Sequence, residues 1–347
     1  MQIVVQSIHF VTQCYKPIKW LIGYGFIFLI CQACMKNSPQ KTSDKNPLLC
    51  DPETGVCEVP ADKSEKAIAQ NTTTEAIKPI QITYFTDPIC SSCWGIEPQL
   101  KRLKLEYGPY FEIDYKMGGL LPSWKVYDSG GISKPADVAH HWDEVSLHYK
   151  MPIDGDVWLE DPLDSSYPPS VAFMAAKAQG TDKALAFLRK IREMVFLQKK
   201  NITKWEHLKE AAQLAGLELA QFKADYEAKA KGDFQQDLSL AKALGVRGFP
   251  TLLMTNGEQQ VRVYGVKEYA HFEQAILKLH PQAKKSTIQP DPAYWLNKFG
   301  TLTTQEVAVI LGKSFQTATE MMTRLVDEKK ATKLAIKNGV LWMAKSK

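Results

Sequence analysis

A chain of 347 residues is long enough for one large domain or two smaller ones, and its composition, with 45% hydrophobic and 23% charged residues, is that of an ordinary globular protein. The net charge of +5 is small for this length, so it gives no argument for a nucleic-acid partner or a strongly acidic partner. All seven cysteines lie in the first 93 residues, which indicates targeting or redox chemistry and leaves the rest of the fold without disulfides.

The first 34 residues have the pattern of a targeting segment. The apolar run Trp20–Ile30 is too short to span a membrane comfortably, but it suits the core of a signal peptide behind Lys16 and Lys19. Cys34 follows this run and a small residue, so it resembles the lipidated cysteine of a lipoprotein cleavage site. We therefore expect a lipoprotein signal. A signal anchor, or a cytosolic chain whose true start lies further in, are the alternatives.

Residues 35–78 have the composition of a linker, rich in Lys, Ser, Thr, Asn, Pro and Glu. Such a linker would hold a folded domain away from a membrane. Within it, Cys50 and Cys57 flank a stretch with Pro, Thr and Gly that favours a turn, so a small disulfide loop is feasible. The alternatives are two unpaired thiols, or an auxiliary redox pair that exchanges with a second cysteine pair further along the chain.

That second pair, Cys90 and Cys93, lies between two segments of different periodicity. Residues 79–85 alternate and are β-branched, which predicts a strand, and the apolar residues after Cys93 have approximately helical spacing. Cys90 is therefore expected at the amino end of a helix, where free N–H groups and the helix dipole stabilise a thiolate. Cys93, one turn later, is placed to resolve a mixed disulfide on Cys90. Two structural cysteines, or half of a zinc site, are the alternatives; the histidines lack finger-like spacing, and we expect neither a metal nor a cofactor.

Residues 111–116 alternate between apolar and polar side chains and predict a second strand. With the strand at 79–85 and the helix between them, it forms a βαβ unit, which is normally right-handed. Residues 121–233 are then mostly helical by pattern. Thr203 with Glu206 predicts a capping box at the start of one of these helices.

Aromatic and histidine side chains in this part of the chain allow two interpretations each. The aromatic residues line a groove beside the cysteines for an extended substrate, or they pack in the core and against loops, which is the commoner role of such rings. His140 and His141 are acid–base groups or a packed or surface pair, and we favour the second interpretation. The aromatic residues concerned are Trp124, Trp142, Trp158 and Tyr167.

The segment Gly245–Thr251 precedes a predicted hairpin. Residues 251–254 and 261–264 alternate as two antiparallel strands around an Asn-Gly turn. Pro250 lies at the start of the first strand, where its missing N–H need not pair. Residues 267–279 predict a closing helix.

Two of these segments resemble signatures of one family. The motif Asp-Pro-Ile-Cys-Ser-Ser-Cys-Trp, ending at Trp94 and followed by Pro98, resembles the active-site turn and kinked first helix of the thioredoxin superfamily. Gly245–Thr251 resembles the loop in which a cis-proline of that superfamily faces the disulfide. The wide interval between the two is similar to that of the DsbA branch, which fills it with helices. Within that branch the motif is most similar to DsbA/FrnE-like proteins and to the SpxH (YjbH) adapter group.

The resemblance covers roughly residues 78 to 282 and implies a thioredoxin fold at 79–282 with a helical insertion at about 121–233. It implies that Cys90 is the nucleophile that forms a mixed disulfide with a substrate protein, and that Cys93 resolves it. It also implies a cis peptide bond before Pro250, which shapes the substrate site. The residues implied to border the substrate are Trp94, Phe249 and Thr251.

Residues 281–292 form a linker of Pro, Lys and Ser, and residues 293–347 predict a second, smaller α+β domain. Thr303 and Glu306 predict a capping box for one helix, and Ser314 predicts the cap of the next.

A hairpin at 334–342 around an Asn-Gly turn completes an arrangement similar to a winged helix. One interpretation is DNA binding by the second helix of this domain. However, Glu320 and Asp327 beside Arg324 leave that helix without a clear basic stripe. Because an export signal is expected upstream, we favour a protein-contact module and expect no nucleic-acid partner.

The sequence as a whole predicts an α/β protein with a thioredoxin fold, a helical insertion and a small winged-helix-like C-terminal domain. The expected function is that of a DsbA-type thiol–disulfide oxidoreductase, as oxidase, isomerase or reductase. Ser91 and Ser92 stand where strongly oxidising DsbA proteins have a histidine, so the direction of electron flow stays open. We expect protein thiol or disulfide substrates, a redox recycling partner, and a place in the cell envelope, periplasmic and held to the membrane by lipid on Cys34.

The alternative is an adapter similar to the SpxH group, which delivers a protein to a protease through non-covalent contacts. Such an adapter would be cytoplasmic and would need no chemistry at Cys90. An isomerase of the glutathione-transferase kappa type is a third alternative, which we disfavour because these proteins usually lack the paired cysteine.

Overall fold

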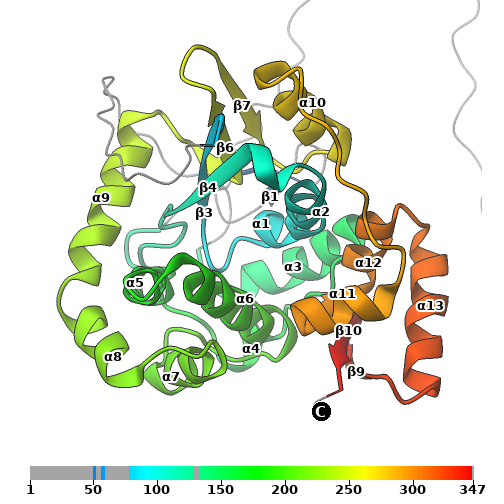
Figure 1. Cartoon of the computed structure of the whole chain (residues 1–347). Helices are drawn as coiled ribbons and strands as arrows, with labels where there is room; N and C mark the ends of the chain where they lie inside the picture. Colours follow the sequence, from blue (N-terminus) through cyan, green and yellow to red (C-terminus); the bar gives the residue numbers. More distant parts are fainter. Residues whose placement is uncertain (1–49, 52–55, 59–77, 128–132, 346–347) are drawn as a thin grey trace, which may run out of the picture. The chain divides into compact units, whose positions relative to one another are not determined.

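The computed structural model describes two short strands at residues 50–51 and 56–58, and then residues 78–127 and 133–345 (Figure 1). The expected signal segment with Cys34, and most of the expected linker, lie outside the described residues. Among the described residues, no helix combines the length and the apolar composition that a bilayer span requires.

A four-stranded mixed sheet lies at the centre of the fold, with the strand order β4-β3-β6-β7. β3 is parallel to β4 and antiparallel to β6, so the predicted βαβ unit and the predicted hairpin share one sheet. Phe85 near the carboxyl end of β3 pairs with Thr251 at the amino end of β6, which brings the segments that follow β3 and precede β6 to the same edge. The strands are β3 (Ile80–Thr86), β4 (Phe111–Met117), β6 (Thr251–Thr255) and β7 (Gln260–Tyr264).

Alternation along β3 supplies apolar side chains to both faces of this sheet. Ile80, Ile82 and Tyr84 pack with apolar residues of two helices, α2 (Glu97–Tyr107) and α10 (Tyr269–Leu279), in one buried cluster. Phe85 faces the opposite way, into a larger cluster formed mainly with the helical insertion. The sheet is therefore covered on both faces, which agrees with the burial of five of the seven residues of β3.

The predicted helical insertion is present and runs from Ala136 to Ala243, with its end about ten residues later than expected. The expected capping box at Thr203 is wrong. The Asn201 side-chain oxygen accepts both the N–H and the hydroxyl of Thr203, at 2.9 and 2.6 Å, so Thr203 lies in a turn and the helix begins at Trp205. The helices are α3 (Ala136–Tyr149), α4 (Val157–Glu160), α5 (Tyr167–Lys177), α6 (Thr181–Leu197), α7 (Trp205–Leu214), α8 (Leu219–Glu227) and α9 (Ala230–Ala243).

The C-terminal residues form three helices and an antiparallel sheet of order β8-β10-β9 around their own apolar cluster. The predicted capping box of Thr303 with Glu306 is confirmed, and so is the cap on Ser314. In the hairpin, Ile336 pairs with Gly339, so the two turn residues precede that glycine and the turn lies one residue earlier than predicted. The elements are α11 (Pro292–Phe299), β8 (Thr301–Thr303), α12 (Thr304–Leu311), α13 (Phe315–Asp327), β9 (Ala331–Ile336) and β10 (Gly339–Ala344).

These C-terminal elements, orange to red in Figure 1, belong to the same compact unit as the central sheet and its helices. α12 packs against α2, and the guanidinium of Arg102 on α2 donates to the carbonyl of Val309 at 3.2 Å. The side chain of Lys337 in the β9–β10 turn forms an ion pair with Asp156 at 2.8 Å, beside α4. The C-terminal part thus contacts the rest of the unit both through α12 and through the β9–β10 turn.

Candidate active site

The cysteine pair lies on a strand-to-helix turn, as the sequence predicts. Cys90 is the N-cap of α1 (Ser91–Gly95), with extended backbone angles, and its sulfur accepts the N–H of Cys93 at 3.1 Å. The two cysteines are joined in a disulfide, with Cα atoms 5.2 Å apart. Both are completely buried. A sulfur at this position receives the stabilisation that the amino end of a helix gives to a thiolate.

The proline loop lies at the same edge of the sheet. The predicted cis bond between Phe249 and Pro250 is confirmed. Phe249 is buried and belongs to the same apolar cluster as Cys90 and Cys93. The Thr251 hydroxyl donates to the carbonyl of Gly248 at 2.7 Å, which ties the two sides of the proline together. The register of β3 with β6 therefore brings together the cysteines and the proline that the sequence singled out.

A glycine that the sequence analysis did not single out makes room for this loop. A side chain at Gly118 would begin only 1.7 Å from the ring of Phe249, closer than any two such atoms approach. Gly118 follows β4 directly and donates its N–H to the carbonyl of Thr86 at 2.7 Å. The segment after β4 thus passes against the residue that precedes the cis-proline.

A second strand pair borders the proline loop. β5 (Gly248–Phe249) is paired antiparallel with β2 (Val56–Glu58), which is paired in turn with β1 (Cys50–Asp51). Cys50 and Cys57 of the expected linker therefore lie on strands, and β2 lies along β5, the strand that precedes Pro250. The sequence predicts a turn and a small disulfide loop between Cys50 and Cys57, but not the two strands.

Asp87, three residues before Cys90, is the buried acid of this turn. Its carboxylate accepts N–H groups from Ile89 at 3.0 Å and Leu120 at 2.8 Å, and the hydroxyl of Ser166 at 2.9 Å. Burial nevertheless raises the pKa of Asp87 to about 6. The motif contains this residue, but its sequence neighbours give no sign of the partners from 33 and 79 positions away.

Trp94 supports the turn from the side of the helical insertion. Its indole N–H donates to the carbonyl of Pro152 at 3.1 Å, and its ring stacks on Phe196 with centroids 5.6 Å apart. The guanidinium of Arg189 lies over the same ring at 4.6 Å. The ring is completely buried, so these contacts make Trp94 a packing residue, and its expected contact with a substrate stays a prediction.

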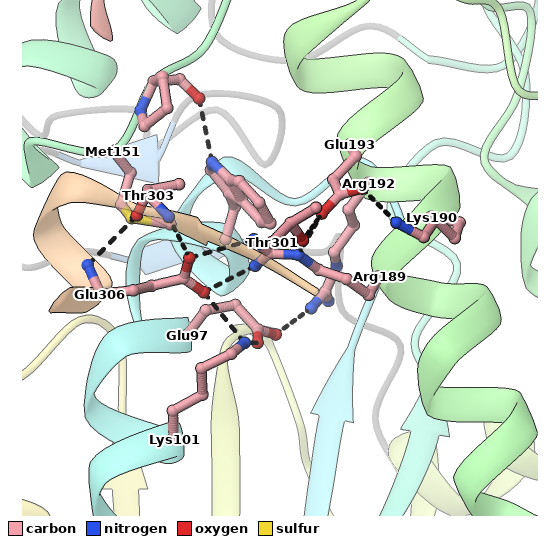
Figure 2. Close-up of polar contacts among 12 residues, drawn as sticks. Glu97, Lys101, Met151, Arg189, Lys190, Arg192, Glu193, Thr301, Thr303 and Glu306 are labelled. Atoms are coloured by element: carbon pink, nitrogen blue, oxygen red, sulfur yellow. Dashed lines mark hydrogen bonds and ion pairs between the residues drawn. The ribbon is translucent and has the colours of Figure 1, made fainter. Parts of the chain in front are cut away.

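Arg189, which covers the Trp94 ring, belongs to a buried cluster of charges, which Figure 2 shows. Arg189 on α6 donates through two nitrogens to the carboxylate of Glu306 on α12, at 2.7 and 3.1 Å, and Lys101 on α2 lies 3.0 Å from the same carboxylate. Glu306 has no exposed surface. Burial alone would raise its pKa, but Arg189 and Lys101 hold the pKa at about 2, so the group is ionised.

The cluster continues to the cysteine turn through α6. Arg192 donates to Glu97 at 2.6 Å and to the hydroxyl of Thr86 at 2.7 Å, just before the turn. Glu193 accepts from Arg189 at 2.7 Å and from the hydroxyl of Thr301. The C-terminal part and the cysteine turn therefore contact the same helix. Sequence reasoning missed this cluster, because charged residues on amphipathic helices are usually solvated.

The remaining candidates, the histidine pair and the aromatic residues, lie at the surface or pack in the core. His140 is exposed and His141 is buried, with a pKa that burial lowers to about 4. The aromatic residues pack edge to face around Trp158, with ring centroids 5.2 Å from Trp142 and 6.0 Å from Trp124. Within the part of the chain that the structure describes, no group of three or more Cys, His, Asp or Glu side chains is placed to hold a metal.

Together, a mixed sheet, a Cys-x-x-Cys pair at a helix amino end and a cis-proline at the same edge define a protein of the thioredoxin class with a DsbA-like helical insertion. A family model described as thioredoxin matches residues 84–274. The ClpXP adapter protein SpxH of Halalkalibacterium halodurans is 35% identical over 306 residues, 86% of this chain and 97% of that protein. The protein of the same name from Bacillus subtilis is 30% identical over 275 residues, 78% of this chain and 90% of that protein. The chain belongs to the thioredoxin family and, within it, to the group of the SpxH proteins.

Solved structures with a similar fold include the cytosolic disulfide reductase DsbM from Pseudomonas aeruginosa. It is 20% identical, with a TM-score of 0.47, over 58% of this chain and 98% of that chain. The α-DsbA1 protein of Wolbachia pipientis is 16% identical, with a TM-score of 0.40, over 59% of this chain and 87% of that chain.

Proposed function

We propose that the protein is a thiol–disulfide oxidoreductase that acts on cysteines of other proteins through Cys90 and Cys93. The observation that carries this proposal is the sulfur of Cys90 at the amino end of α1, bonded to Cys93 and at the same sheet edge as cis-Pro250. A buried structural disulfide needs neither the helix end nor the proline. Both are useful for exchange, because they stabilise a leaving thiolate and offer backbone to a client.

In the oxidising direction, a client thiolate attacks the sulfur of Cys90, and the sulfur of Cys93 leaves as a thiolate. A second client thiolate then attacks the client sulfur of this mixed disulfide and releases Cys90. The client loses two electrons, and Cys90 and Cys93 gain them and take up two protons. The reducing direction runs through the same mixed disulfide, and a recycling partner restores the starting state.

The test compares exchange with a reduced model protein, such as unfolded ribonuclease, for the wild type and the Cys90→Ser variant. We expect reoxidation, or in the reverse assay insulin reduction, only with the wild type. In Cys93→Ser, the Cys90 thiolate should attack a disulfide of insulin, displace one insulin thiolate and remain trapped as a mixed disulfide. The matched control Ser91→Ala changes the same turn without removing a sulfur, and it should retain most of the activity. Equal rates for the wild type and Cys90→Ser would contradict the proposal.

A second candidate is an SpxH-like adapter that presents a client protein to a protease. The observation that favours it is the identity of 35% to a protein named as a ClpXP adapter, along 97% of that protein's length. In this case the winged-helix-like C-terminal module would serve as a protein-contact surface. Client binding by such an adapter would not require the sulfurs. The Cys90→Ser variant should therefore accelerate degradation of a client by purified ClpXP to the same extent as the wild type. Loss of this acceleration in the variant would count against an adapter.

The proposed site of action is the cell envelope, with the chain held by lipid on Cys34. This proposal is supported by the apolar run and the cysteine that follows it. Cells fed labelled palmitate should incorporate the label into the wild type and not into the Cys34→Ser variant. An unlabelled wild type in the soluble cytoplasmic fraction would instead favour the adapter.

A further inference from the structure

The backbone edge directly before cis-Pro250 is already occupied by the chain itself. β2 lies antiparallel to β5, with Cys57 opposite Phe249 and Glu58 opposite Gly248. The edge of a short strand binds an added strand through main-chain hydrogen bonds, and the register then decides which residue of the added strand lies at each position. The strand added here comes from the amino-terminal part of the same chain.

The register places a cysteine at the active-site end of this added strand. Cys57 is opposite Phe249, and the next residue after Phe249 is the cis-proline. Phe249 belongs to the same buried cluster as Cys90 and Cys93. The fold therefore brings the backbone of Cys57 beside the loop that a client cysteine would approach.

The same register pairs Cys57 with a second cysteine. In the β1–β2 hairpin, the Cα atom of Cys50 is opposite that of Cys57. Opposite residues of antiparallel strands have Cα atoms roughly 4.5–5.5 Å apart, and a disulfide spans this separation. On one side of β2, Cys57 is thus opposite Cys50 of β1. On the other side, it is opposite Phe249 of β5, directly before the proline.

We propose that Cys50 and Cys57 are an internal redox pair that exchanges two electrons with Cys90 and Cys93, with Cys57 as the residue that reacts with Cys90. This inference rests on the proposed function, because it requires Cys90 to be active in exchange. The hairpin is docked as a client strand would be, so the chain carries its own redox partner. Tethering raises the effective concentration of such a partner to the millimolar range, above that of most external clients.

The exchange balances without any further reactant. With Cys50 and Cys57 reduced, the thiolate of Cys57 attacks the sulfur of Cys90, and Cys93 leaves as a thiolate. The thiolate of Cys50 then attacks the sulfur of Cys57, which closes the Cys50–Cys57 disulfide and releases Cys90. Two electrons pass to Cys90 and Cys93, which take up the two protons that Cys50 and Cys57 gave up. The reverse sequence reoxidises Cys90 and Cys93.

The test traps the intermediate in the full-length chain. The double variant Cys50→Ser with Cys93→Ser removes both resolving thiols, so the Cys57–Cys90 disulfide should accumulate in a glutathione redox buffer. Peptide mapping by mass spectrometry without reduction identifies the linked peptides. The matched control, Cys57→Ser with Cys93→Ser, leaves Cys50 as the only hairpin thiol and should give at least tenfold less linkage to Cys90.

The outcomes separate this inference from the proposed function. If the double variant forms only glutathione adducts while Cys93→Ser still traps an external client protein, the internal relay is wrong and the oxidoreductase stands. If neither the hairpin nor a client is trapped on Cys90, both fail. Linkage found only between two copies of the chain, as a covalent dimer, would overturn the intramolecular exchange, and linkage in the monomer supports it.

Discussion

At the scale of single residues, Asp87 joins the cysteine turn to the loop after β4. Its carboxylate accepts from the backbone of Ile89 on one side and of Leu120 on the other, and Ser166 adds a hydroxyl. These bonds favour the ionised group, but burial outweighs them and raises the pKa to about 6. A carboxyl with this pKa changes its charge near pH 6, and it does so three residues before Cys90.

The raised pKa of Asp87 predicts a pH dependence of stability. The folded protein keeps the proton between pH 3.8 and about 6, whereas the unfolded chain loses it. The stabilisation is therefore fully present below pH 3.8 and is lost as the pH rises to about 6, with a total of about 3 kcal/mol. In Asp87→Asn this slope should disappear. Urea unfolding of the wild type and of Asp87→Asn between pH 4 and 7.5 measures this slope. If the unfolding free energies of the two proteins changed with pH in parallel, the raised pKa of Asp87 would be contradicted.

The close approach of Gly118 to Phe249 gives a second prediction at this scale. In Gly118→Ala the new methyl group would overlap the Phe249 ring, so the residue before the cis-proline must move. We expect a loss of about 1–3 kcal/mol in the free energy of unfolding and slower exchange with clients. Gly232→Ala is the control, because nothing lies within 4 Å of the added carbon in α9, and it should be neutral or slightly stabilising. Equal stability of the two variants would refute the overlap.

At the scale of elements, α6 connects the C-terminal part to the cysteine turn. Arg189 pairs with Glu306 of α12 and covers Trp94 of α1, and Arg192 on the same helix reaches Thr86 at the end of β3. A buried ion pair of this kind is weak evidence for stability against an apolar alternative, but removing one partner leaves a buried charge without compensation. The arrangement therefore fixes how α12 sits on α6 more than it adds to stability.

Removal of the carboxylate in Glu306→Gln is expected to cost about 3 kcal/mol or more in the free energy of unfolding. Glu210→Gln is the matched control, because Glu210 pairs with Lys200 at 2.6 Å at the surface, and its loss should cost less than about 1 kcal/mol. The wild type should also lose stability as the pH falls from 4.5 towards 2, because the folded pKa of Glu306 lies below the unfolded one. If urea unfolding gave equal losses of unfolding free energy for Glu306→Gln and Glu210→Gln, a buried ion pair at Glu306 would be contradicted.

At the scale of the whole molecule, local patterns predicted the parts and long-range contacts decided their assembly. The strand–turn–helix around Cys90 and the cap at Thr303 follow from neighbouring residues, so the sequence was sufficient for both. The cap expected at Thr203 failed because Asn201, two residues away, binds its polar groups first. Arg189 and Glu306 lie 117 positions apart in the sequence, so no local pattern of residues predicts that they pair.

The contacts of the C-terminal part with α2, with α6 and with Asp156 before α4 predict that it stays bound without a covalent link. A protease site inserted between Ser286 and Thr287, both exposed, allows the chain to be cut after folding. Because Glu306 remains paired with Arg189, and Lys337 with Asp156, the two fragments should co-elute in size-exclusion chromatography at neutral pH and micromolar concentration. In a cut Glu306→Gln protein the dissociation constant of the two fragments should rise at least tenfold, since the buried guanidinium of Arg189 then keeps only Glu193 of its two carboxylate partners. Fragments of the cut wild type that elute apart at neutral pH would show that the linker, and not the charge cluster, holds the C-terminal part in place.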